Sequence, residues 1–219
     1  YDELKVLIGL YKTHPSQKVI LLGHSWGAML ATGYTGQYPN DVDGLIVAEP
    51  GGLEWADVQQ YFKQSRSLSF WSEAFNDATF LDQFIMGEQN QHEILDYKIA
   101  LLSASSVNVG DVKPNLGTNA QYYRSSRNGA VVSAAMFEFG EQFKPNLSAG
   151  ISNFQRKVLF LYSSNNKAYS DSWAQKISAA YPVKELFKVQ GVGHSGMLDQ
   201  IDVWTTATEP RIVQYLESL

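Results

Sequence analysis

Residues 23–27 read GHSWG, a serine with a glycine two positions before it and another two positions after it. Four apolar residues, 19–22, precede this segment, and a run of small and apolar residues, 28–32, follows it. G-x-S-x-G between a strand and a helix is typical of a tight turn that presents the serine hydroxyl as a nucleophile. Glycine fits both flanking positions because the backbone is crowded around such a turn. The spacing therefore predicts that Ser25 attacks a carbonyl carbon.

The backbone amide of Trp26 follows the serine at the predicted start of a helix. A helix N-terminus favours negative charge, and an amide N–H aimed at a developing oxyanion stabilises it. We therefore expect this amide to donate to the negative oxygen that forms when Ser25 attacks.

A serine hydroxyl is a poor nucleophile unless a base lies within hydrogen-bond distance. His194 is the best candidate because it follows the last predicted strand, in the glycine-flanked loop 191–196, and so belongs to the same sheet edge as the serine. The fold must bring the two residues together, since they are far apart in the chain. His24 is expected to pack beside the turn instead of acting as the base. The other histidines are expected on the surface: His14 and His92.

The base needs a third group that orients its ring and stabilises its positive charge. Glu49 is the preferred candidate because it ends an apolar strand at the same edge, where a buried carboxylate requires a partner. The loop after the strand predicted at 157–162 begins with hydroxyls and amides, and an amide does not offset a positive charge. Three alternatives stay open: Asn165, Asn166 and Asp171, the last of which also fits a helix N-cap.

Strands and helices alternate along most of the chain. Strands are predicted at 18–23, 43–49, 157–162 and 183–189, and helices at 2–13, 26–37, 170–180 and 210–218. This alternation predicts an α/β fold, with a mostly parallel, doubly wound sheet and helices on both faces. The uniformly apolar run at 19–22 indicates a strand that is buried on both faces and has neighbours at both edges.

Residues 53–149 interrupt the alternation with helical spacing and many aromatic, Gln, Asn and Ser residues. The interruption leaves from the carboxyl end of a strand, where ligands bind in open parallel sheets, so we expect a lid over Ser25. Three segments follow: a core at 1–52, a helical cap at 53–150 and a second core part at 151–219. The aromatic residues of the cap indicate an apolar substrate pocket, although each also fits the internal packing of the cap.

The composition argues against several classes of function. The chain has 219 residues and a formal net charge of −5, without a Lys/Arg cluster, so no nucleic-acid partner is expected. It has no cysteine for disulfides or thiolate sites, and its histidines lack zinc-ligand spacing, so no metal or other cofactor is expected. No apolar run approaches the roughly 18 residues of a membrane span. The expected partner is a small-molecule or short-peptide substrate.

These motifs together resemble the α/β-hydrolase superfamily, and within it capped enzymes of the proline iminopeptidase and small-ester hydrolase type. The resemblance implies that Ser25 is the nucleophile, His194 the base and the Trp26 amide half of an oxyanion hole. The common aspartate of the family falls at about Asn166, whereas some capped relatives place the acid after the earlier strand, as at Glu49. The implied function is hydrolysis of an ester or N-terminal amide bond through an acyl-enzyme. The alternative is a non-catalytic ligand-binding protein on the same fold.

The sheet of this family has eight strands, and the predicted strands match the last four. The second half of the oxyanion hole belongs to a loop that comes before them. The resemblance therefore implies a further N-terminal segment or a separate chain that pairs with the strand at 18–23.

Overall fold

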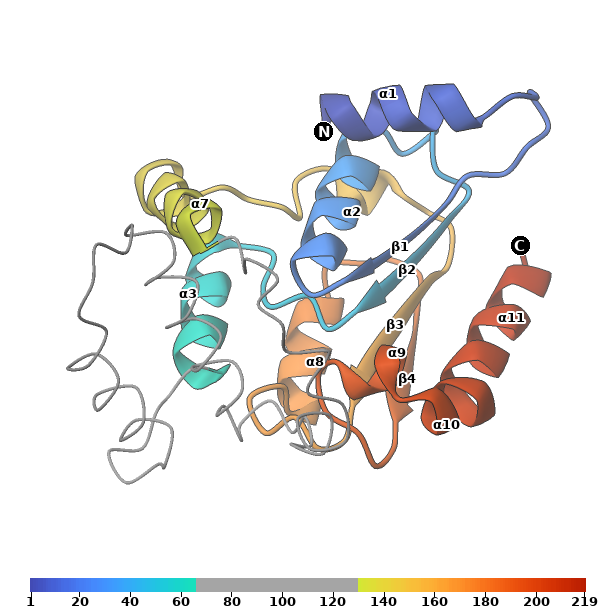
Figure 1. The fold of residues 1–219 in the computed structure, drawn as a ribbon. Coiled ribbons are helices and arrows are strands. Elements are labelled where there is room, and N and C mark those ends of the chain that lie inside the picture. The colour runs from blue at the N-terminus through green and yellow to red at the C-terminus, as the bar shows by residue number, and fades with distance from the viewer. Residues whose placement is uncertain (66–129) are drawn as a thin grey trace, which may run out of the picture.

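The computed structural model describes residues 1–65 and 130–219. Four parallel strands in these residues form one sheet in the order β1-β2-β3-β4 (Figure 1). The strands are β1 (Ile20–His24), β2 (Gly44–Ala48), β3 (Val158–Ser163) and β4 (Lys184–Val189). The predicted α/β class and parallel sheet are confirmed, with small shifts at the strand ends.

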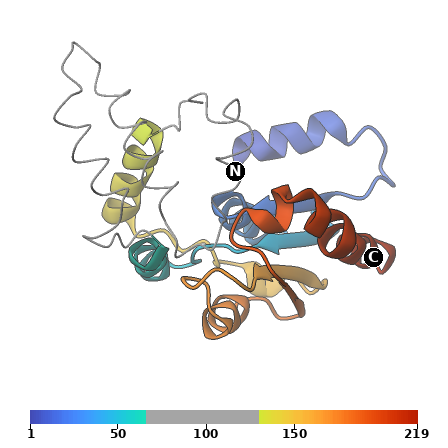
Figure 2. The same ribbon diagram turned by 60° about the horizontal axis from the view of Figure 1, so that its bottom comes forward.

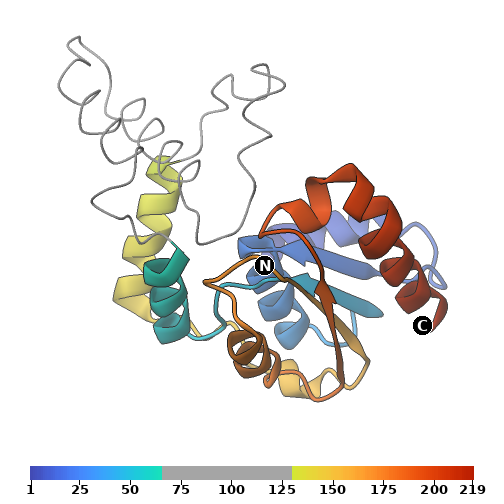
Figure 3. The ribbon, with the colours of Figure 1, turned by 90° about the horizontal axis from the view of Figure 1, so that it is seen from below.

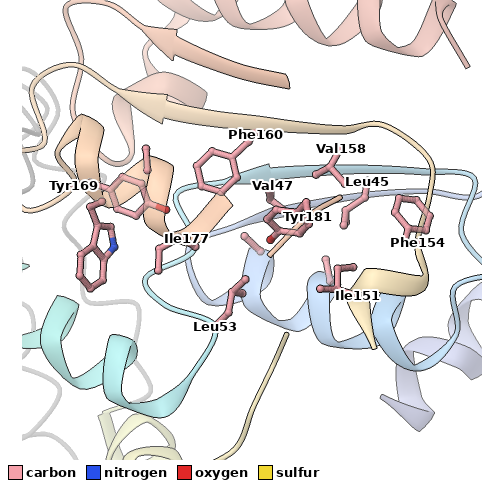
Figure 4. Close-up of a cluster of buried hydrophobic side chains, with 14 of the residues drawn as sticks. Leu45, Val47, Leu53, Ile151, Phe154, Val158, Phe160, Tyr169, Ile177 and Tyr181 are labelled. Atoms are coloured by element: carbon pink, nitrogen blue, oxygen red, sulfur yellow. The ribbon is translucent and has the colours of Figure 1, made fainter. Parts of the chain in front are cut away.

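Helices cover both faces of the sheet (Figure 3). One face packs against α2 (Trp26–Gln37) and α8 (Asp171–Ser178), and the other packs against α9 (Gly196–Asp199) and α11 (Glu209–Glu217). Alternate residues of a strand point to opposite faces, so β2 and β3 supply apolar side chains to both layers. Figure 4 shows the first layer, with these strand residues at its centre: Leu45, Val47, Val158 and Phe160.

The C-terminal region holds more helices than the one predicted at 210–218. After α9 come α10 (Ile201–Val203) and the π-helix η3 (Trp204–Thr208), which leads into α11. A short 3₁₀ helix, η2 (Ile151–Asn153), precedes β3. The N-cap of α8 is Ser170, whose Oγ accepts a hydrogen bond from the Trp173 amide at 3.3 Å. Asp171, which also fitted an N-cap, instead lies in the first turn of α8.

Strand β1 is less buried in the described chain than its apolar sequence suggests, and its pairing with a further N-terminal segment or chain stays a prediction. Within the described residues only β2 pairs with it, so it forms an edge of the sheet. Leu22 is 48% exposed and its two predecessors are half-buried, whereas every residue of β2 is buried. The apolar run matches the interior in composition, but burial depends on what packs against the strand, and the described chain supplies one neighbour.

Helix α1 (Asp2–Tyr11) packs against the core with only part of its predicted apolar face. Leu4 and Ile8 contact the buried cluster. Leu7 and Tyr11 are 49% and 76% exposed. The helix lies across the end of α2 at the rim of the molecule (Figure 1). One side of its apolar face therefore packs against the core, and the other side is exposed.

The two described ends of the predicted cap each form a helix, α3 (Trp55–Ser65) and α7 (Ala130–Phe143). The helices lie side by side, beyond the carboxyl ends of the strands (Figures 1 and 2). Phe137 packs against Trp55 and Phe62, with ring centroids 5.2 and 4.9 Å apart. These aromatic residues pack within the helix pair. The aromatic residues of the cap between 66 and 129 lie outside the described residues, and the three-segment division stays a prediction.

Candidate active site

Ser25 occupies the turn between β1 and α2 in a strained backbone conformation, with φ 54° and ψ −120°. Its amide donates to the Ala48 carbonyl at 2.8 Å, so the turn stays anchored to the end of β2. Its side chain makes no capping hydrogen bond to the helix that it begins. A non-glycine residue with this φ costs about 1–3 kcal/mol, and such strain concentrates at functional sites.

The two glycines of the turn differ in what they do. A Cβ on Gly23 would lie 2.3 Å from the Gly27 carbonyl oxygen, so no side chain fits there. A Cβ on Gly27 would meet nothing within 4 Å outside its own helix. The expected crowding is therefore confirmed at Gly23 and wrong at Gly27, where the described chain leaves open space.

The amide of Trp26 is the first in helix α2, beside the serine. No group among the described residues accepts a hydrogen bond from it. The Trp26 residue is 45% exposed. The amide thus has the place and the free N–H that the sequence predicts for an oxyanion donor.

Glu49 and His194 meet at the end of β2. The His194 Nδ1–H donates to Glu49 Oε2 at 2.6 Å. The Glu49 side chain is fully buried, and that of His194 is 16% exposed. Glu49 also has a positive φ, 43°, and with Ser25 it makes up two of the three such non-glycine residues in the described ranges. The carboxylate that the sequence favoured is therefore the one that the histidine contacts.

Three further hydrogen bonds hold the Glu49 carboxylate. Oε1 accepts from the amide and the hydroxyl of Ser163 at 2.7 and 2.6 Å, and Oε2 accepts from Asn166 Nδ2 at 2.7 Å. The Ser163 amide and Asn166 Nδ2 can only donate, so each carboxylate oxygen faces at least one obligate donor. A buried carboxylate is stable only with such a set of donors.

The other candidates for the acid do not contact the histidine. Asn166 instead donates a hydrogen bond to Glu49. The backbone amide of Asn165 donates to the Val192 carbonyl, in the loop that carries His194, at 2.9 Å. Asp171 forms an exposed ion pair with Lys188 at 2.7 Å. Among the four candidates, the structure brings Glu49 alone to the imidazole.

Ser163 is a site residue that the sequence analysis missed. It ends β3, beside the end of β2. A hydroxyl residue at the end of a neighbouring strand is the sequence feature that could have identified it. Tyr61 of α3, one of the aromatic residues of the predicted cap, was not expected at the site either. Its hydroxyl accepts from Asn166 Nδ2 at 3.2 Å, which joins the first cap helix to the Glu49 network.

Aromatic rings enclose this network. Tyr61 packs edge-on against Tyr169 and stacks on Trp173, with centroids 5.5 and 6.3 Å apart. Burial, and then the nearby Glu49 carboxylate, raise the pKa of Tyr169 well above its ordinary value. The phenol therefore stays protonated and donates to the Pro50 carbonyl at 2.9 Å. On this side the Glu49 network is therefore buried among aromatic side chains.

The imidazole of His194 lies beside the end of β1, the strand that leads into Ser25. His24 faces Ala48 in the β1–β2 register, and its ring centroid is 4.5 Å from that of His194. Its Nε2 also lies 2.9 Å from the His194 carbonyl oxygen. The expectation that His24 only packs is therefore incomplete. No hydrogen bond joins Ser25 to His194 among the contacts of the described residues.

The described ranges contain no group of three or more His, Asp or Glu residues that could hold a metal ion. They also contain no helix with the length and apolarity to cross a membrane. Nδ1 of His194 is hydrogen-bonded to Glu49, an arrangement suited to proton transfer through the other ring nitrogen.

Similarity to solved structures supports the fold. The chain is similar to proline iminopeptidase from Mycobacterium smegmatis, with a TM-score of 0.59 at 12% identity over 98% of this chain and 70% of that one. It is also similar to a putative lipase from Acinetobacter baumannii AYE, with a TM-score of 0.55 at 15% identity over 100% and 67% of the two chains.

Among curated proteins, the chain is 37% identical over 78 residues to 1-acylglycerol-3-phosphate O-acyltransferase ABHD5 of Sus scrofa. The match covers 35% of this chain and 20% of that relative, and a match to a Caenorhabditis elegans protein, abhd-5.2, covers 15% of that protein. Residues 10–200 match the sequence model of the family described as alpha/beta hydrolase fold. With its parallel sheet and strained serine turn, this chain belongs to the α/β-hydrolase fold family.

Proposed function

We propose that this protein is a serine hydrolase that cleaves an ester or N-terminal amide bond of a small substrate through an acyl-enzyme. The observation that carries the proposal is the 2.6 Å hydrogen bond from His194 to the fully buried Glu49, next to a serine in a strained turn. Ser25, His194 and Glu49 are the nucleophile, base and acid of this proposal.

The hydrogen bond sets the protonation of the base. Because Nδ1 carries the proton that Glu49 accepts, Nε2 of a neutral His194 has a free lone pair. That nitrogen takes the proton of Ser25 Oγ as the oxygen attacks the substrate carbonyl carbon. The buried carboxylate then stabilises the imidazolium, which returns the proton to the leaving alcohol or amine.

The oxyanion and the second half-reaction follow from the same groups. The Trp26 N–H, which has no acceptor among the described residues, donates to the negative oxygen of the tetrahedral intermediate. His194 next takes a proton from water, and the resulting hydroxide attacks the acyl-enzyme. The acid product leaves, and Ser25 recovers its proton.

The acyl group can pass either to water or to an alcohol, and the two reactions can be compared directly. The relative from Sus scrofa is named as an O-acyltransferase. If an alcohol attacked the same acyl-enzyme in place of water, the product would be a new ester. Assays should therefore measure transfer to an added alcohol beside hydrolysis.

A second candidate is a non-catalytic binding protein on this fold. The missing hydrogen bond between Ser25 and His194 favours it. However, catalytic hydrogen bonds are often long without substrate and tighten when it binds. The strain at Ser25 has no evident use in a binding protein, so hydrolysis is the better supported function.

Fluorophosphonate labelling tests the proposal directly, because the reagent reacts with an activated serine. We expect wild type to be labelled and Ser25→Ala to stay unlabelled. His194→Gln should react at least about 10³-fold more slowly, and His14→Gln is the matched surface control. Turnover of p-nitrophenyl esters and aminoacyl-arylamides then separates esterase from aminopeptidase. Equal labelling of wild type and Ser25→Ala would refute the proposal.

A further inference from the structure

The loop that carries the base is held from two sides. On the β3 side, Ser164 Oγ accepts from the Gly191 amide at 2.8 Å and the Asn165 amide donates to Val192 at 2.9 Å. On the β1 side, His24 Nε2 reaches the carbonyl oxygen of His194 itself at 2.9 Å. His24 is the last residue of β1 and directly precedes the serine. One side chain therefore joins the strand of the nucleophile to the backbone of the base.

The chemistry of this contact fixes a tautomer. A carbonyl oxygen only accepts, so His24 Nε2 must carry the proton and donate it. The two imidazoles also lie against each other, with their planes tilted by 40°. Glu49 orients the His194 ring through Nδ1, but that bond alone leaves the ring free to move with its glycine-rich loop.

We propose that His24 is a positioning residue of the site: its Nε2–H holds the His194 backbone against the end of β1 and so sets the distance from the imidazole to Ser25. This inference rests on the proposed function. Glu49 sets the orientation of the His194 ring, and His24 sets its position.

Two variants that differ by one methylene group test the inference. The amide nitrogen of His24→Gln reaches about as far as imidazole Nε2, whereas that of His24→Asn is too short. The measured quantity is the rate at which a fluorophosphonate labels Ser25, with unfolding followed in parallel. We expect His24→Gln to react at close to the wild-type rate. His24→Asn and His24→Phe should react roughly 3- to 10-fold more slowly, the value of one net hydrogen bond.

The outcomes separate the two claims. Equal rates in His24→Gln and His24→Asn, whether fast or slow, would overturn the role of His24, because the donor would then be irrelevant. A purely structural role would lower the unfolding midpoint and leave the labelling rate of the folded protein unchanged, which also overturns the inference. If His24→Phe fails to fold, the Gln and Asn pair still decides. Labelling that survives Ser25→Ala would instead refute the proposed function.

Discussion

The ends of two adjacent strands carry the two halves of the candidate site, and they are built differently. At the end of β2, Glu49 is fully buried and its two oxygens accept four hydrogen bonds. At the end of β1, the Ser25 hydroxyl has no hydrogen bond to the base, and Trp26 is 45% exposed. The strands differ in the same way, since β2 is buried throughout and β1 forms an edge.

The difference follows from what each group must do. A carboxylate can be buried only where donors replace its water, so its surroundings must be complete before any substrate arrives. Under the proposed function Ser25 must meet the substrate, which an accessible strand end allows. Strain at Ser25 and full pairing at Glu49 are thus two forms of preorganisation, one of backbone and one of hydrogen bonds.

The largest expected effect comes from removing the charge of the acid. All partners of Glu49 donate, so the NH₂ group of Glu49→Gln opposes a donor in either orientation. If that NH₂ faces His194, it favours the tautomer with the proton on Nε2, which cannot accept from Ser25. We expect kcat to fall about 10³- to 10⁴-fold. Steady-state kinetics on the best ester substrate measures this, and a loss below tenfold would contradict the role of Glu49.

The next effect tests the backbone of the nucleophile half. Gly23→Ala would force its Cβ against the Gly27 carbonyl, and we expect it to destabilise the fold by about 3 kcal/mol or to prevent folding. Gly27→Ala is the matched control, because no described residue would meet its Cβ and alanine favours a helix. Urea denaturation of both variants gives the difference. Similar losses in the two would mean that the turn is not crowded as described.

A smaller effect tests the hydrogen bonds of the acid half. Asn166→Asp replaces a donor by a second carboxyl group 2.7 Å from Glu49, and two such groups must share a proton. We expect a loss of about 2–3 kcal/mol in the free energy of unfolding. The double variant Glu49→Gln with Asn166→Asp has one charge again and should recover part of that loss. Additive losses in the double variant would show that the two side chains do not interact.

The smallest effect concerns Asp171, the remaining alternative acid. Its hydrogen bond from Lys188 lowers the pKa of the carboxyl below its ordinary value of 3.8. The stabilisation is therefore present above pH 3.8 and lost as the pH falls through the lowered pKa. Asp171→Asn should lower Tm slightly at neutral pH, a difference that shrinks in acid, and leave kcat unchanged because the pair is exposed. A large loss of kcat would reopen the choice of the acid.

Much of the fold and site could be predicted because it depends on local pattern. The serine turn, the parallel strands and the base loop follow from glycine spacing and apolar runs, which act over a few residues. The preference for Glu49 also came from its position at a strand end.

The tertiary structure decided what local pattern does not contain. Four polar residues were candidates to contact the imidazole, and the choice depends on where side chains from distant segments converge. There Asn166 donates a hydrogen bond to Glu49 and does not contact the imidazole. His24, expected only to pack, contacts a carbonyl 170 positions further along the chain. Within the described residues the apolar run of β1 lies at an edge, although it is as hydrophobic as a central strand, because burial depends on the neighbours and not on the strand itself.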